Sequence, residues 1–192
     1  RRLFVLQDGS GSAWDQQYII GHELTHLYLW NAVGAPSSVM LSEGAAVYAG
    51  SKLVEGQGPI PLQHLCLAYA RAGALPSVAA DLSYQGHIRD LENYYTAGCF
   101  VQYLIESYGV DAFARLYPTS DYEGVYSKNL PTLADEWQTH LLAGPDDLPF
   151  DPETFVTAAE QIKNGYRELF AAFGDTPAER TRYLQLDRTR TA

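Results

Sequence analysis

The 192-residue sequence predicts a mainly α-helical protein of the α+β class, with one small β element and a C-terminal helical hairpin. Three observations support this fold class. Apolar residues recur at helical spacing along most of the chain, and only residues 3–6 are typical of a strand, which the turn at 8–11 closes. Two strong helix starts follow the Gly- and Pro-containing segment 144–149. We therefore expect a domain at 1–144 and a helical extension at 145–192 packed on it.

The expected helices are, in chain order, 13–33, 41–54, 62–73, 93–108, 110–117, 130–142 and 151–173, with a last helix opening at 176. Gly34-Ala35-Pro36 and the segment 56–61 are connectors, and residues 74–92 are expected to be irregular. Trp137 is a predicted core anchor. Asp151-Pro152-Glu153 provides a cap, a proline at the first position and an acid in the first turn. The sequence 176–179, Thr-Pro-Ala-Glu, is a capping box.

The strongest functional signal is the pentad His22-Glu23-Leu24-Thr25-His26 in the first predicted helix. Histidines four residues apart lie on one helix face, about 40° apart around the axis, so both imidazoles can reach a single cation. Glu23 points roughly a quarter turn away, which suits a base acting on a metal-bound water better than a ligand. The pentad indicates zinc-assisted hydrolysis, most often of a peptide bond. The plain alternative is a surface helix that carries two histidines by chance.

The residues around the pentad predict that this helix is mostly buried and forms the floor of a cleft. Its apolar positions are Trp14, Tyr18, Ile19 and Ile20 before the pentad, and Leu24, Leu27 and Trp30 within and after it.

Glu43 is the predicted third ligand. It lies in a segment rich in small residues, 41–54, which is expected to form a helix that packs closely against the first. No other acidic residue occurs from there until Glu55. Two histidines and one carboxylate would leave a fourth zinc position open. The alternative is an ordinary acid in a first helical turn, which the helix dipole favours.

Residues 21–26 and the later Leu41-Ser42-Glu43-Gly44-Ala45-Ala46-Val47-Tyr48 together resemble the gluzincin zinc metallopeptidases. Within that group they are similar to the peptidase MA-like family and, more distantly, to the M1 aminopeptidases. A second match at 95–109 opens with Tyr-x-x-Gly, like the M1 helix whose tyrosine stabilises the oxyanion. The resemblance covers about three-fifths of the chain. It implies a thermolysin-type catalytic domain at 1–144 that binds Zn²⁺ through His22, His26 and Glu43, with Glu23 as base and Tyr95 as helper.

The assignment of Tyr95 has alternatives, because the chain contains fourteen tyrosines. Tyr94 and Tyr95 would point about 100° apart on a helix, so only one is expected to face a metal. His87, in the preceding loop, is a further candidate donor. His64 and His140 lie in apolar helical patterns and are expected to be structural.

Two departures from the resembling families affect the expected activity. Thermolysin-like gluzincins place an Asp four residues after the ligand glutamate, where it orients a histidine ligand, and this chain has Val47 there. A backbone carbonyl, Ser42 or a distant acid must then take that role. The M1 exopeptidase motif Gly-Ala-Met-Glu-Asn is absent from the sequence. In a longer protein this motif would lie upstream of residue 1, so endopeptidase and aminopeptidase activity both stay open.

Composition restricts the class of partner. A net charge of −10 argues against nucleic acid or an anionic membrane surface as partner and leaves a peptide or protein substrate. No apolar segment is long enough to span a membrane. Because the chain starts Arg1-Arg2-Leu3 without Met, we expect a fragment or a processed form. An extracellular or cell-envelope location is favoured.

Cys66 and Cys99 both fall in apolar helical contexts, where a reduced, buried cysteine behaves as a small hydrophobic residue. The reduced state is therefore the preferred prediction, and a disulfide, which would indicate an oxidising compartment, is the alternative.

The sequence as a whole predicts a zinc metallopeptidase. Two other functions remain open: a catalytically silent zinc-binding or scaffold module of the same fold, and a zinc hydrolase of a non-peptide amide or an epoxide. Silent modules usually lose the base or a ligand, and here Glu23, His22, His26 and Glu43 are all present.

Overall fold

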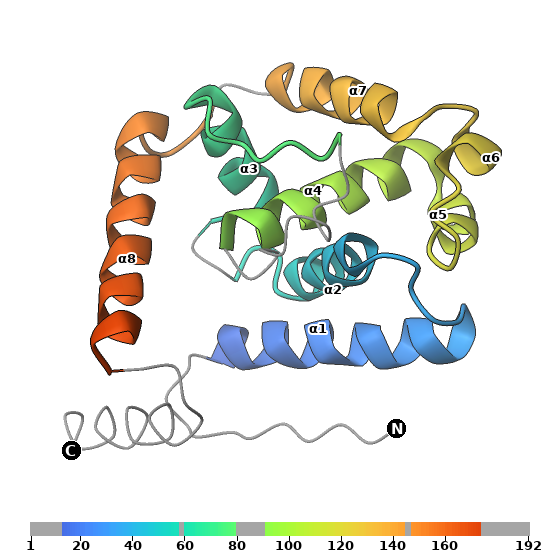
Figure 1. Cartoon of the computed structure of the whole chain (residues 1–192), viewed down its shortest axis with the longest axis horizontal. Helices are drawn as coiled ribbons and strands as arrows, with labels where there is room; N and C mark the ends of the chain where they lie inside the picture. The colour runs from blue at the N-terminus through green and yellow to red at the C-terminus, as the bar shows by residue number, and fades with distance from the viewer. Residues whose placement is uncertain (1–12, 58–59, 80–90, 145–146, 174–192) are drawn as a thin grey trace. The chain divides into compact units, whose positions relative to one another are not determined.

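The computed structural model describes residues 13–57, 60–79, 91–144 and 147–173, and these residues form eight α-helices and no strand. The prediction of a mainly α-helical protein is confirmed for this part of the chain. The chain divides into two compact units, 1–149 and 150–192 (Figure 1). The predicted strand at 3–6 and the predicted helix from 176 lie outside the described residues.

The first unit contains seven described helices: α1 (Ala13–Ala32), α2 (Val39–Leu53), α3 (Leu62–Arg71), α4 (Leu91–Tyr108), α5 (Val110–Leu116), α6 (Tyr122–Tyr126) and α7 (Leu130–Leu142). All but α6 were predicted to within a few residues. Because α6 is a single turn, it shows no apolar period in the sequence. Its start does carry a local signal, since the Asp121 carboxylate accepts a hydrogen bond from the Gly124 amide at 2.9 Å.

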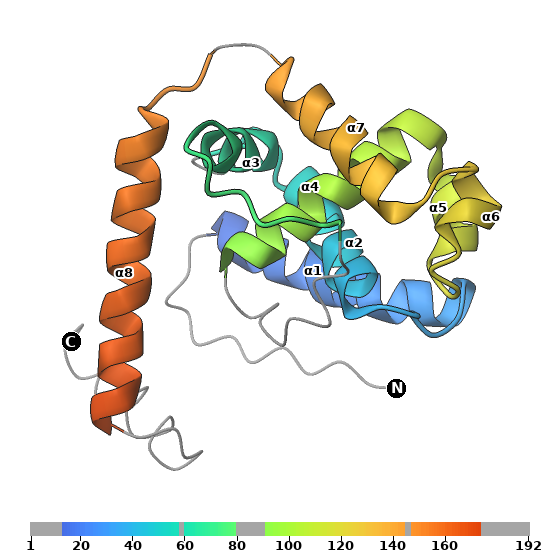
Figure 2. The same ribbon diagram turned by 45° about the horizontal axis from the view of Figure 1, so that its top comes forward.

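α2 lies between α1 and α4, as both views show (Figures 1 and 2). Small residues on α2 make this possible. A Cβ added at Gly44 would lie 2.5 Å from the Ala97 carbonyl oxygen on α4, and one added at Gly50 would lie 3.0 Å from the Tyr18 carbonyl oxygen on α1. The predicted close packing of the two helices is thus confirmed, and α2 is in close contact with helices on both sides.

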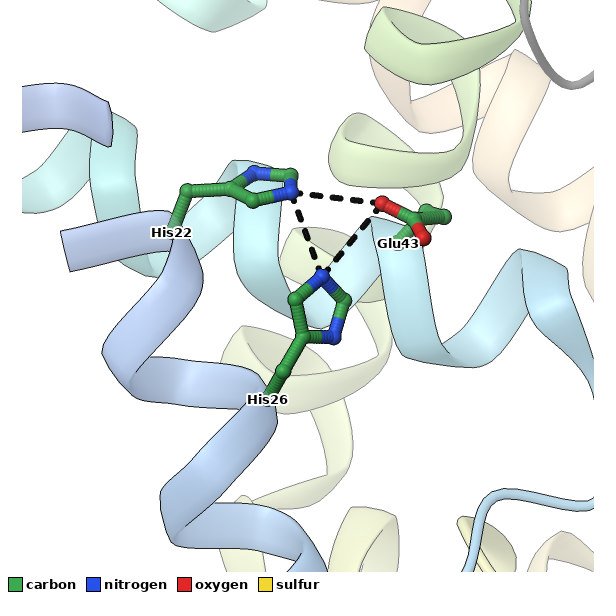
Figure 3. Close-up of side chains that lie close together, drawn as sticks. All are labelled: His22, His26 and Glu43. Carbon is green, nitrogen blue, oxygen red and sulfur yellow. Dashed lines mark hydrogen bonds and ion pairs between the residues drawn. The ribbon is translucent and has the colours of Figure 1, made fainter. Parts of the chain in front are cut away.

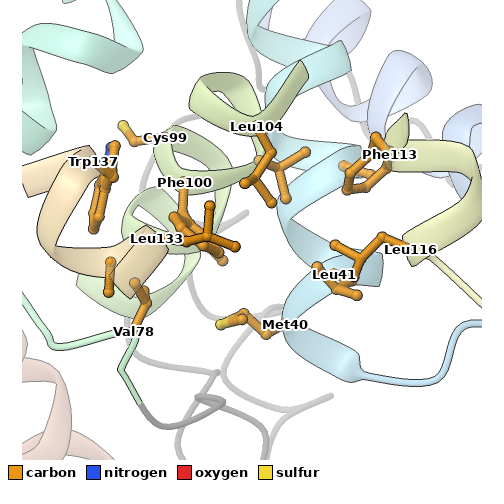
Figure 4. Packing of buried hydrophobic residues seen from close by; sticks show 14 of the residues in the cluster. Met40, Leu41, Val78, Cys99, Phe100, Leu104, Phe113, Leu116, Leu133 and Trp137 are labelled. Carbon is orange, nitrogen blue, oxygen red and sulfur yellow. The ribbon is translucent and has the colours of Figure 1, made fainter. Parts of the chain in front are cut away.

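The hydrophobic core of the first unit lies among α2, α3, α4, α5 and α7 (Figure 4). Met40 and Leu41 on α2 and Phe100 on α4 are completely buried. The Phe100 and Trp137 rings meet edge to face at 5.6 Å between centroids, and Trp137 is 3% exposed. The prediction of Trp137 as a core anchor is confirmed.

The prediction that the first helix is mostly buried is wrong. α1 has no fully buried residue, Leu24 is 50% exposed and Trp30 is 39% exposed. The reason is that, among the described helices, only α2 packs extensively against α1. One face of α1 therefore meets the rest of the unit and the other meets solvent. No helix in the described ranges is both long and apolar enough to cross a membrane.

Cys66 on α3 and Cys99 on α4 form a disulfide, so the preferred prediction of two reduced cysteines is wrong. α3 packs against α4, and both cysteines face the core between them, at 0% and 3% exposure. Each residue satisfies the apolar pattern of its own helix, and this pattern says nothing about which helices become neighbours. The sequence therefore left the pairing undecided.

The second unit contains α8 (Pro152–Phe173), and its predicted start is confirmed. One carboxylate oxygen of Asp151 accepts hydrogen bonds from the Thr154 amide at 2.8 Å and the Thr154 hydroxyl at 2.7 Å. Two donors hold the pKa of Asp151 below its usual value. Phe150, just before the helix, stacks on Phe155 with ring centroids 4.8 Å apart.

Gly44→Ala should destabilise the first unit. The new methyl group would meet the α4 backbone at Ala97, which cannot move aside cheaply, and such overpacking costs about 1–3 kcal/mol. The better helix propensity of alanine offsets up to about 1 kcal/mol of this loss. Thermal or denaturant unfolding should therefore show a lower free energy of unfolding.

Gly21→Ala is the matched control, because Gly21 also lies in a helix beside a predicted ligand. Its added Cβ would meet mainly Leu53 Cδ2, at 2.9 Å, the end of a flexible side chain that is 53% exposed. We expect no loss of stability from this change. Equal losses from both substitutions would contradict the close approach of α2 to α4.

Candidate metal centre

His22, His26 and Glu43 point their side chains toward one another, two from α1 and one from α2 (Figure 3). The two histidine Nε2 atoms are 3.2 Å apart. Glu43 Oε2 lies 3.2 Å from His22 Nε2 and 3.5 Å from His26 Nε2. The three residues of the sequence prediction therefore meet at one point.

This triangle of atoms has the dimensions of one face of a zinc tetrahedron. Ligand atoms at about 2.0–2.1 Å from a tetrahedral zinc ion lie about 3.3–3.4 Å from one another. The three separations of 3.2, 3.2 and 3.5 Å are close to that value. Two imidazole nitrogens and a carboxylate oxygen are also the donor types that zinc takes in catalytic sites. The residues therefore fit a zinc ion with one position open.

Local structure explains why the three side chains converge. Helical spacing puts His22 and His26 one turn apart on the α2 side of α1. The side chain of Ser38 caps α2 and accepts a hydrogen bond from the Leu41 amide at 3.3 Å, which fixes where the helix begins. Glu43 follows one turn later, next to Gly44, where α2 lies against α4.

The carboxylate of Glu43 is ionised over the whole physiological range. Burial alone would raise its pKa, but hydrogen bonds from His22 and His26 outweigh burial and lower the pKa to about 2. The hydrogen bond to Glu43 raises the pKa of His26, although burial opposes the shift. The site thus concentrates negative charge and attracts a positive charge, either a proton on the imidazoles or a metal ion.

His26 is oriented from behind by Ser42. The His26 Nδ1 atom lies 3.1 Å from the Ser42 hydroxyl oxygen, and the Tyr117 hydroxyl donates to the same oxygen at 3.5 Å. When Nδ1 donates to Ser42, Nε2 keeps its lone pair for the metal. Ser42 was one of three alternatives for this role in the sequence. Tyr117 was missed, since it lies 75 residues away on the chain.

The ligands line a cavity of about 410 Å³, which is within the range of about 300–1,000 Å³ found for small-ligand sites. The nine residues that line it are His22, Glu23, His26, Trp30, Pro36, Ser42, Glu43, Tyr94 and Tyr117. Glu23, the predicted base, therefore shares the cavity with the three ligands. Trp30 had been assigned to a buried apolar face, and Pro36 to a connector.

The two neighbouring tyrosines of α4 have different positions. The structure places Tyr94 in the cavity, with its ring centroid 6.5 Å from that of His22. Tyr95 is not among the lining residues, and burial raises its pKa. Tyr94, which was the alternative in the sequence, is thus the tyrosine of this pair with access to the site.

His64 and His140 are not brought to the site. His64 Nε2 lies 3.6 Å from an Asp147 carboxylate oxygen, and the His140 ring lies 5.4 Å from the Tyr103 ring. His87 lies outside the described residues. Within the site, His22 Nδ1 is buried without a hydrogen-bond partner among the residues that the structure describes.

No family model, curated protein or solved structure matches this chain. The candidate site is therefore defined by its own residues: two histidines and a glutamate converging on one point, and a second glutamate beside them in a small cavity.

Proposed function

We propose that this protein is a zinc metallopeptidase of the gluzincin type that hydrolyses peptide bonds. The observation that carries the proposal is the triangle of two Nε2 atoms and one carboxylate oxygen, with edges of 3.2–3.5 Å, in the same cavity as Glu23. The triangle alone would support a metal site of any kind. The additional carboxylate, which is not part of it, supports hydrolysis.

His22, His26 and Glu43 would hold the zinc ion, and Ser42 would keep His26 in the tautomer that offers Nε2. Bound zinc supplies Lewis-acid chemistry, which polarises a carbonyl group and makes water more acidic. The Glu23 carboxylate would accept a proton from the attacking water and later deliver it to the leaving amine. Tyr94 on α4 lines the same cavity, and its hydroxyl would donate a hydrogen bond to the carbonyl oxygen as negative charge develops there.

The cysteines support the proposed compartment. A disulfide between Cys66 and Cys99 persists in an oxidising environment. This favours an extracellular or cell-envelope location, where a peptide or protein would be the substrate. The net charge of −10 is unfavourable for nucleic acid as a partner.

Purified protein should bind one zinc ion per chain, and the affinity should fall as the pH drops. Zinc requires neutral imidazoles, and the raised pKa of His26 means that protons begin to compete from somewhat above the usual histidine value of about 6.5. Glu43, with a pKa of about 2, stays ionised throughout. Calorimetric titration with zinc from pH 5.5 to 8 measures this dependence.

The stability of the metal-free protein should change with pH in the opposite direction. Because the folded-state pKa of His26 is raised, its pairing with Glu43 contributes fully to the free energy of unfolding below the unfolded-state pKa. This contribution is lost as the pH rises through the folded-state pKa.

Elemental analysis of protein purified without chelator provides the number of zinc ions per chain. A zinc content below a few tenths of an equivalent, unchanged by added zinc, would refute the ligand assignment.

Glu23→Gln should abolish hydrolysis and leave zinc bound. The amide keeps the shape of the side chain but cannot accept a proton, and that step contributes roughly 10²–10⁴ in rate. Glu43→Ala should instead weaken zinc binding itself, because it removes a charged ligand. Peptide cleavage and zinc content are measured on both variants.

The same pair of variants also tests the silent-module alternative. If the zinc-loaded parent protein cleaves no peptide, the alternative is favoured. If Glu23→Gln keeps more than a tenth of the parent activity, or loses its metal, the division of roles between the two glutamates is wrong.

Tyr94→Phe should lower kcat with little change in KM, because its hydrogen bond would form chiefly in the transition state. Loss of one such donor costs about 10²–10³ in rate. Tyr95→Phe is the matched control and should be nearly neutral in activity. Kinetics of the two variants on one peptide decide between them, and the reverse pattern would return the role to Tyr95.

A further inference from the structure

One end of the cavity is apolar and contains none of the three candidate metal ligands. Trp30 follows His26 by four residues, so it lies one turn further along α1, about 6 Å beyond the histidine. Its side chain lines the cavity and is 39% exposed, which leaves ring surface for a ligand to cover. Pro36, from the connection between α1 and α2, also lines the cavity.

This end of the cavity is held in place by hydrogen bonds between distant parts of the chain. The Ser37 amide and hydroxyl both donate to the Tyr117 carbonyl oxygen, at 3.0 and 2.9 Å. The Ser37 hydroxyl also lies 2.7 Å from the Ser120 hydroxyl. These bonds fix the segment that carries Pro36 against the C-terminal end of α5. The apolar surface is therefore formed before any ligand arrives, which reduces the entropy lost on binding.

The charge of the cavity limits what can occupy this end. Its acidic residues are Glu23 and Glu43, and no lysine or arginine is among the described residues that line it. In the described part of the chain, no lysine or arginine of the cavity lining could pair with a carboxylate side chain beside Trp30, and a zinc ion at the candidate site would draw such a carboxylate toward itself and away from the ring. A neutral, apolar group has no such penalty and gains from covering the ring and the proline.

We propose that Trp30 and Pro36 form a specificity subsite for a large apolar side chain within two residues of the scissile bond; this rests on the proposed peptidase function. An extended peptide advances about 3.3 Å per residue, so a side chain one or two residues from a carbonyl at the metal reaches the Trp30 ring. The subsite favours a neutral, apolar side chain over an acidic one, because Trp30 and Pro36 offer it no side-chain cation. The substrate class is thus a peptide with a large apolar residue next to, or one residue away from, the cleaved bond.

Binding can be measured separately from cleavage with the 192-residue Glu23→Gln variant loaded with zinc. The probes are peptides blocked by N-acetyl and C-amide groups that differ at one position, which is Phe, Ala or Glu. A fourth peptide, which ends at the Phe with a free carboxylate, controls for binding of a carboxylate to the zinc ion. We expect the blocked Phe peptide to bind about tenfold more tightly than the Ala peptide by calorimetry, with the Glu peptide no tighter than the Ala peptide.

Trp30→Ala, made in the same background, should reduce the preference for Phe over Ala to about twofold and leave zinc content and Ala-peptide affinity unchanged. Trp30→Phe should restore part of the preference. Tyr28→Ala is the matched control, since Tyr28 lies on α1 but is 71% exposed and does not line the cavity. It should leave the preference intact. Equal affinities for the Phe and Ala peptides, or a Phe preference that survives Trp30→Ala, would overturn the subsite.

Cleavage of the same peptides by the zinc-loaded parent protein separates the two proposals. Cleavage without any preference for Phe would remove the subsite and keep the peptidase function. A Trp30-dependent preference in binding, without cleavage of any peptide, would remove the peptidase function and keep the subsite. If the chain does not take up zinc, the same calorimetry on the metal-free protein still tests Trp30.

Discussion

The close approach of α2 to both of its neighbours is the constraint on which the candidate site depends. Glu43 can reach His22 and His26 only because α2 lies directly against α1, and glycine at position 50 allows that contact. On its other side, Gly44 lets α2 lie against the α4 backbone at Ala97. A bulkier residue at either glycine would push α2 away from its neighbour and shift Glu43 with it. The distances of 3.2 and 3.5 Å from Glu43 to the two histidines therefore depend on how closely the helices pack.

The residues behind the three candidate ligands connect the site to α5, which lies much later in the chain. Tyr117, at the end of α5, contacts Ser42 through its hydroxyl group and Ser37 through its carbonyl oxygen. Ser42 in turn orients His26. His26 is thus held by a serine and a tyrosine, where thermolysin-like gluzincins use an aspartate to orient a histidine ligand. A neutral partner withdraws the imidazole proton less strongly than a carboxylate would, which leaves Glu43 as the main source of negative charge at the ligands.

The residues of α1 that line the cavity lie at the edge of the packed helices. α1 is covered on one side only, so His22, Glu23, His26 and Trp30 lie at a boundary between the packed helices and solvent. At such a boundary the backbone is held by packing while the side chains stay accessible to solvent. Metal binding requires the first property and substrate access the second. The disulfide between α3 and α4 holds α4 in place, and α4 carries Tyr94, which lines the cavity.

The sequence alone determined the elements with a local cause: helix ranges from apolar spacing, the α8 start from its capping residues, and the pair His22–His26 from the helical repeat. It also identified Glu43, because a single acid stood in a segment of small residues. Which of Tyr94 and Tyr95 lines the cavity, the Cys66–Cys99 bond, the contact of Tyr117 with Ser42 and the exposure of α1 came only with the tertiary structure. Each depends on how one helix is rotated and placed against another, and residues distant in the chain decide that.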